Sequence, residues 1–234
     1  MKTVTGKTSR ILTQAADQIA DTISTHPHTV IALGANDDCL LLYHELRSRC
    51  VLGTLDLSGI RFFALTEFDG ITADDPNSCR SRLREALLDA ADPNGDRSIF
   101  LNEKNAEDYD SMIAKAGGLD LAILGVGQRG RIGFNEPGTA FDSVTHRQKL
   151  TKATKRELSA VFGGEDGVPG FGLTMGIQSI LGAKEILVFT CGKDQADPVF
   201  RMLYARDDSF VPAAFLQLPL QVTVYADEAA AAKL

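Results

Sequence analysis

The sequence LDLAILGVGQRGRIGFNEPG at residues 119–138 joins a short apolar run to a glycine-rich loop. An apolar run of this length, bounded by glycines, is typical of a strand that is buried on both faces of a parallel sheet. The glycines at 125, 127 and 130 fit a tight turn that leaves the strand, because glycine adopts positive φ without steric cost. Ligands of open α/β sheets bind outside the carboxyl ends of the strands. The loop is therefore the first candidate for a binding site.

Similar apolar runs alternate with helical patterns along the rest of the chain. Strands are predicted at 29–34, 60–65, 98–102, 119–127, 147–151, 184–192 and 218–226. Helices are predicted at 8–25, 39–50, 77–92, 106–118, 152–162 and 197–205, with Asn77 or Ser78 as the N-cap of the third, and a loop at 163–172. This alternation predicts an α/β fold: a Rossmann-like, open, mostly parallel sheet with helices on both faces. No linker divides the chain, so we expect a single domain over residues 1–234.

The composition argues against several classes of function. The chain has 234 residues and a formal net charge of −7, which disfavours nucleic acid as a partner, because phosphate backbones attract clustered basic residues. No apolar run approaches the roughly 20 residues of a membrane-spanning helix, and the N-terminal MKTVTGKTSR lacks the apolar segment of a signal peptide. The four cysteines have no metal-binding spacing, so we expect free thiols and a cytoplasmic location. We expect the protein to bind neither a metal nor another cofactor.

Several segments resemble one family of sugar-phosphate enzymes. The pattern GGLDLAILGVG-x-x-G-x-I-x-FNEPG is similar to the signature of glucosamine-6-phosphate deaminases and galactosamine-6-phosphate isomerases, to which 6-phosphogluconolactonases are more distantly related. VIALG with LLLYHEL, FFALTEF, and VPGFGLTMGIQSILGAKEILVFTCG resemble other segments of that family. The resemblance extends over about residues 8–226. It implies the isomerisation of an amino-sugar phosphate, which in the deaminases is accompanied by loss of ammonia.

The positions that transfer protons in the family differ in this chain. The reaction needs a base that moves a proton from C2 to C1, and a histidine with a carboxylate that opens the sugar ring. The resemblance places the base at Thr66, whose hydroxyl cannot act as a base at neutral pH. It places an aspartate and the ring-opening histidine at Arg129 and Arg131, which can only donate hydrogen bonds.

Glu67 and Glu136 match glutamates of the family and are therefore the candidate catalytic residues. Each has an alternative explanation, since a carboxylate can also brace a loop by accepting backbone hydrogen bonds. We expect Arg129 and Arg131 to bind a carboxylate or phosphate together, because two guanidinium groups on one glycine turn can converge on an anion. The alternative is that both are solvated loop charges.

The family's phosphate-binding segments give the other candidates for ligand binding. The segment GANDDC at 34–39 follows the first predicted strand, and a helix N-terminus there favours an anion, although its two aspartates would repel a phosphate. The family lysine after the late strand aligns with Gln195, and Lys193 lies two residues away. The candidate ligand-binding residues are Arg129, Arg131, Gly127, Gly34, Asn36, Thr66 and Lys193.

The sequence thus predicts an amino-sugar-phosphate isomerase- or deaminase-like protein of carbohydrate metabolism whose altered site binds a phosphorylated or acidic sugar. Whether it is an enzyme stays open at this point, because the family's base and histidine are replaced. The alternative is a non-catalytic sensor or subunit that binds a sugar phosphate. A 6-phosphogluconolactonase-like hydrolase ranks last, because the Asp-Gly-His of that reaction is absent. Members of the family are often oligomeric, so a homo-oligomer is a further hypothesis, with no nucleic-acid or membrane partner.

Overall fold

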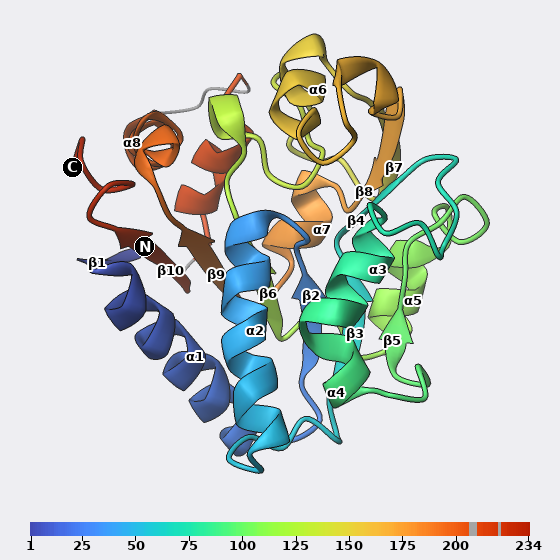
Figure 1. The fold of residues 1–234 in the computed structure, drawn as a ribbon, viewed down its shortest axis with the longest axis vertical. Helices are drawn as coiled ribbons and strands as arrows, with labels where there is room; N and C mark the ends of the chain where they lie inside the picture. The colour runs from blue at the N-terminus through green and yellow to red at the C-terminus, as the bar shows by residue number, and fades with distance from the viewer. Residues whose placement is uncertain (206–209, 220) are drawn as a thin grey trace.

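A seven-stranded sheet with the strand order β1-β10-β9-β6-β2-β3-β5 forms the centre of the protein (Figure 1). The computed structural model describes residues 1–205, 210–219 and 221–234. Every pairing between neighbouring strands of this sheet is parallel. The predicted architecture, an open and mostly parallel sheet in one α/β domain, is confirmed.

The elements have the following bounds. The strands of the central sheet are β1 Lys2–Gly6, β2 Val30–Leu33, β3 Arg61–Ala64, β5 Ser98–Ile99, β6 Leu121–Leu124, β9 Glu185–Thr190 and β10 Val222–Asp227. The α-helices are α1 Thr8–Thr25, α2 Asp37–Val51, α3 Cys79–Leu83, α4 Asp89–Ala91, α5 Tyr109–Lys115, α6 Lys152–Leu158, α7 Ile177–Leu181 and α8 Ala196–Tyr204. The 3-10 turns are η2 Gln128–Gly130, η3 Glu165–Gly167, η4 Lys193–Gln195 and η5 Pro212–Gln217, and η1 Arg84–Leu88 is a π-helical turn.

Strand β6 is apolar throughout because helices cover both faces of the sheet. Its side chains alternate between two clusters: Leu121 and Ile123 pack with α1, α2 and α3, whereas Ala122 and Leu124 pack with α5, α7 and α8. All four residues of the strand are buried. A strand that contacts an apolar cluster on each side gains nothing from polar residues, which explains the continuous apolar run in the sequence.

A second, three-stranded antiparallel sheet lies beyond the carboxyl ends of the central strands (Figure 1). It consists of β4 Thr66–Phe68, β8 Phe171–Thr174 and β7 His146–Lys149, and it carries α6. Leu65 is the single residue between the end of β3 and the start of β4. The chain thus leaves the central sheet and enters the small sheet at the position where the resemblance places the catalytic base.

Several local features differ from the sequence predictions. Strand β1 was not predicted, because its alternating, mostly exposed residues at the edge of the sheet give no apolar signal. The predicted helix at 77–92 is interrupted by the π-helical turn η1, although Ser78 does cap α3 by accepting a hydrogen bond from the N–H of Ser81. The predicted loop at 163–172 contains η3 and the first residues of β8. Among the described residues, no helix is both long enough and apolar enough to cross a bilayer.

Candidate functional site

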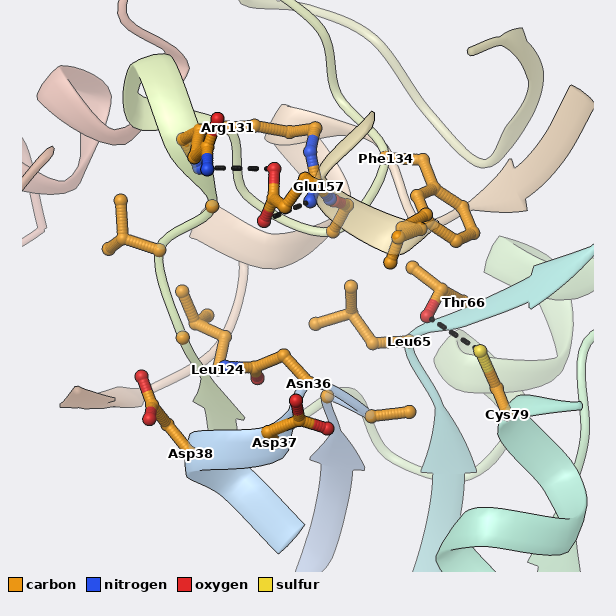
Figure 2. A pocket seen from close by; sticks show the side chains of 18 of the residues that line it. Asn36, Asp37, Asp38, Leu65, Thr66, Cys79, Leu124, Arg131, Phe134 and Glu157 are labelled. Carbon is orange, nitrogen blue, oxygen red and sulfur yellow. Dashed lines mark hydrogen bonds and ion pairs between the residues drawn. The ribbon is translucent and has the colours of Figure 1, made fainter. Parts of the chain in front are cut away.

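A cavity of about 320 Å³ lies at the carboxyl edge of the central sheet. The segments that follow β2, β3, β6 and β9 form its floor and one wall. The opposite wall comes from α6 and the residues after it, at Glu157, Leu158 and Val161 (Figure 2). The cavity therefore lies where the parallel sheet and the small antiparallel sheet meet, which is the usual position for a ligand site in an open α/β fold.

Two glycines of the loop after β6 allow close contacts with side chains. A Cβ atom on Gly125 would lie 2.1 Å from the side-chain nitrogen of Asn36, and one on Gly127 would lie 2.6 Å from Nη2 of Arg131. Gly127 has a φ of −81°, so its backbone conformation does not require glycine. The expectation that positive φ explains Gly127 is therefore wrong, since the requirement is space for the guanidinium group of Arg131.

Positive φ occurs further along the same loop. Gly130 and Gly133 have φ values of 76° and 56°, and Arg129 has a φ of 63°. A non-glycine residue in the left-handed region is disfavoured by about 1–2 kcal/mol. Arg129 is exposed and does not line the cavity, and neither does the exposed Lys193. The two guanidinium groups predicted to converge on one anion therefore do not converge, because the turn directs Arg129 outward.

Arg131 does line the cavity, and its charge is already compensated. The residue is 8% exposed, and its Nη2 lies 3.1 Å from Oε1 of Glu157. Nη1 donates to the carbonyl oxygen of Gly133, whereas Nε is buried and has no partner. The second carboxylate oxygen of Glu157 accepts the backbone N–H of Gln128 at 3.3 Å. Arg131, a candidate from the sequence, thus lines the cavity, whereas its partner Glu157 on α6 gave no signal in the sequence.

Thr66 lines the cavity, but its neighbour Glu67 does not. Successive residues of strand β4 point in opposite directions, so only one of the two can face the cavity. The Thr66 hydroxyl lies 3.5 Å from the sulfur of Cys79, which also lines the cavity (Figure 2). No carboxylate thus stands at the position where the resemblance places the base.

Glu67 holds the start of α3. Its carboxylate accepts the backbone N–H groups of Phe68 at 2.8 Å, of Cys79 at 2.9 Å and of Arg80 at 2.9 Å. Burial raises the pKa of this carboxyl, and the backbone hydrogen bonds partly oppose the shift. These contacts favour the bracing explanation over a catalytic role.

Glu136 is similarly occupied at the start of α6. The residue is buried, and its carboxylate accepts the N–H of Thr151 at 3.0 Å and the hydroxyl of Thr151 at 3.3 Å. Thr151 is in turn the N-cap of α6, since its side chain accepts the N–H of Thr154. Glu136 does not line the cavity, so it fixes the helix that forms the cavity's far wall.

The side of the cavity formed by α2 is acidic. Gly34 and Asn36, two of the candidate ligand-binding residues, line it together with Asp37 and Asp38. Asp37 forms an ion pair with Arg82, a lining residue of α3. Burial is the main cause that raises the pKa of Asp38 from 3.8 to about 6. Arg82 and Cys79 escaped the sequence analysis, although their spacing of three residues on a predicted helix places them on one face.

The lining carries more negative than positive charge. Both arginines that line the cavity are paired, whereas Asp38 and Asp194 form no ion pair within the part of the chain that the structure describes. The described residues also contain no group of three metal-ligating side chains that could hold an ion. The site is therefore an acidic, partly apolar cavity whose two cationic groups are internally neutralised.

Comparisons with known proteins match this geometry to one family. A family model described as glucosamine-6-phosphate isomerases/6-phosphogluconolactonase matches residues 7–225. A glucosamine-6-phosphate deaminase from Halalkalibacterium halodurans is 36% identical over 94% of this chain and 92% of its own length. Glucosamine-6-phosphate deaminase 1 from Bacillus subtilis is 35% identical over 99% of this chain and 98% of its own.

Solved structures agree with the sequence comparisons. The structure of a monomeric glucosamine-6-phosphate deaminase covers 100% of both chains with a TM-score of 0.95 and 33% identity. The 6-phosphogluconolactonase of Trypanosoma brucei shares the fold, with a TM-score of 0.80 over 100% of this chain and 98% of its own, at 18% identity.

Replacing Glu67 with alanine is expected to lower the free energy of unfolding by about 2–4 kcal/mol, because three backbone N–H groups lose their buried acceptor. Urea unfolding monitored by circular dichroism measures the change. Glu165→Ala is the matched control, since Glu165 is an exposed glutamate whose ion pair with Arg156 lies at the surface. An equal change in both variants would contradict the bracing role of Glu67.

Replacing Asp38 with asparagine is expected to stabilise the protein above pH 6. The folded-state pKa of Asp38 is raised, so its stabilising contribution is complete below pH 3.8 and is lost as the pH rises through about 6. At pH 7.5 the variant should exceed the wild type by about 1–3 kcal/mol, and the difference should vanish near pH 4. Urea unfolding from pH 4 to 8 tests this, with the exposed Asp166→Asn as control. Parallel curves for wild type and Asp38→Asn would contradict it.

Proposed function

The chain belongs to the glucosamine-6-phosphate isomerase/6-phosphogluconolactonase family, and we propose that it binds an anionic sugar without catalysing the family's isomerisation. The ligand is a sugar phosphate or a sugar acid, and it occupies the cavity at the carboxyl edge of the sheet. The observation that carries the proposal is Thr66, which stands in the cavity wall where an isomerase of this kind needs a carboxylate.

The cavity has the size and the lining that a sugar requires. Its volume of about 320 Å³ falls within the range of about 300–1,000 Å³ that is usual for small-molecule sites. Asn36, Gln128 and Gln195 offer amide and backbone groups that can hydrogen-bond to hydroxyls, and Leu124 and Phe134 offer apolar surface for a ring face. The relatives of known activity are glucosamine-6-phosphate deaminases, which supports an amino-sugar phosphate as the first ligand to test.

The proposed loss of catalysis is supported by the positions of the two glutamates that match the family. Proton abstraction requires a base within about 3 Å of the proton that it removes. Glu67 and Glu136, the two glutamates that match the family, accept backbone hydrogen bonds and lie outside the lining of the cavity. Arg131, at the position of the ring-opening histidine, cannot release a proton at neutral pH. Binding without turnover is the function that remains, as in a sensor or a regulatory subunit.

One observation favours a second candidate function, an enzyme that uses Asp38 as its acid–base group. Asp38 lines the cavity, and its pKa is raised to about 6 by burial. A carboxyl with such a pKa exchanges protons near neutral pH, which suits general acid–base catalysis. In this enzyme the acid–base group would lie on the α2 side of the cavity, and not at the position of Thr66.

The location and the assembly of the protein remain predictions. All four cysteines are free thiols, which is compatible with the cytoplasm. A homo-oligomer also stays a hypothesis, and the solved relative described as monomeric shows that one deaminase of similar fold acts without a partner chain.

Incubation with glucosamine 6-phosphate and galactosamine 6-phosphate tests the proposal. Neither substrate is expected to yield ammonia or ketose above a protein-free control, since Thr66 stands at the position of the family's base. The same sugars are expected to raise the melting temperature, because a ligand present at 100 times its Kd stabilises the folded state by about 2.7 kcal/mol. Turnover that persists in Asp38→Asn would contradict the proposal, whereas turnover that Asp38→Asn abolishes would establish the second candidate.

A further inference from the structure

The glycine loop already holds an anion, and that anion is the chain's own Glu157. One carboxylate oxygen accepts from Nη2 of Arg131 at 3.1 Å, and the other accepts the backbone N–H of Gln128 at 3.3 Å. A guanidinium group beside a loop N–H is a common arrangement for binding carboxylates and phosphates in proteins. The loop therefore binds a carboxylate of the chain itself, through one arginine and one backbone N–H.

The hydrogen bonds of Arg131 are incomplete. The residue is 8% exposed, Nη1 donates to Gly133, and Nη2 donates to Glu157, but the buried Nε has no acceptor. A buried donor without a partner is costly and uncommon in a native structure. Nε and Nη2 lie on the same edge of the guanidinium group, where a carboxylate can bind to both nitrogens. Glu157 uses only one of them, so an incoming anion can make a contact that Glu157 does not make.

The position of Glu157 allows an exchange of occupants. Its side chain is 21% exposed, so the carboxylate can rotate toward solvent without unfolding α6. The opposite end of the helix is fixed, because Glu136 binds Thr151 at the N-cap. Leu158 follows Glu157 and also lines the cavity. Movement of the carboxylate would therefore enlarge the cavity at the Arg131 end while the helix stays anchored.

We propose that Arg131 and the N–H of Gln128 form the binding site for the anionic group of the sugar, and that Glu157 occupies this site until the ligand displaces it. This inference rests on the proposed function, since it assumes that the cavity takes a sugar. The recognised chemistry is a carboxylate or a phosphate on a polyhydroxy ligand.

The distribution of charge sets the orientation of the ligand. Figure 2 shows Arg131 and Glu157 at one end of the cavity and Asp37 and Asp38 at the other. An anionic group near the aspartates would be repelled, and the cation there, Arg82, is already paired with Asp37. The anionic group therefore lies at the Arg131 end, and the hydroxyl or amino groups of the sugar face the α2 end.

Isothermal titration calorimetry on Glu157→Gln tests the exchange. Gluconate, glucose 6-phosphate and neutral glucose are the probes, and Arg129→Gln is the matched control, since Arg129 lies outside the cavity. Glu157→Gln is expected to bind at least one of the two anionic sugars at least tenfold more tightly than wild type, about 1.4 kcal/mol, and glucose within twofold of wild type. A gain for gluconate alone assigns a carboxylate site, and a gain for glucose 6-phosphate alone assigns a phosphate site. The double variant Glu157→Gln/Arg131→Gln should lose the gain.

A second variant and a second probe separate the possible failures. Gly127→Ala keeps all charges and displaces the guanidinium group of Arg131. In a protein that retains Glu157, this variant should therefore bind anionic sugars more weakly than wild type. Inorganic phosphate should raise the melting temperature of Glu157→Gln and leave that of the double variant unchanged. Equal affinities of wild type and Glu157→Gln for the anionic sugars would overturn the inference and leave sugar binding intact. Stabilisation by phosphate without binding of any sugar would support the anion site and overturn the proposed function, and binding of no probe would overturn both.

Discussion

Burial of strand β6 on both faces constrains the positions of all other parts of the protein. Its residues alternate between two apolar clusters, so helices must cover each side of the sheet, and the connections between parallel strands must cross from one edge to the other. The carboxyl ends of β2, β3, β6 and β9 consequently meet at one edge. The segments that follow these strands leave the core at that edge, and the cavity forms there because the small sheet with α6 covers the opening from the other side. The position of the cavity thus follows from how the core is buried.

Two buried glutamates that match the family make contacts that stabilise the fold. Glu67 and Glu136 each accept hydrogen bonds from groups at the start of a helix, α3 in one case and α6 in the other. Both helices contribute residues to the cavity wall, namely Arg82 and Glu157. The carboxylates therefore hold the starts of the two helices that contribute to the walls, although neither lines the cavity. A match to a family motif can reflect this structural requirement as easily as a chemical one, since the same hydrogen bonds are needed whether or not the reaction takes place.

The sequence predicted the layers of the fold well because the central strands other than the edge strand β1 carry an apolar signal, as in 119–127, and the long helices carry a periodicity, as in 8–25. It also located the glycine loop and the position of Arg131. It could not predict that Arg129 points outward, because the left-handed turn at that residue has no sequence signature without glycine. Nor could it pair Glu157 with Arg131, since 26 residues separate them and the contact depends on the small sheet. The three residues of β4 are too few to show a period, so the direction of Thr66 relative to Glu67 was also undetermined.

The contact between Gly127 and Arg131 has a consequence for how this sequence can change over generations. The guanidinium group occupies the space that a Cβ atom at 127 would need, so a side chain at 127 would require the guanidinium group to move. A lineage that acquires a side chain at 127 would therefore keep arginine at 131 only in a shifted position, whereas glycine at 127 leaves the present position open to it. The effect of a substitution at 127 thus depends on which residue stands at 131.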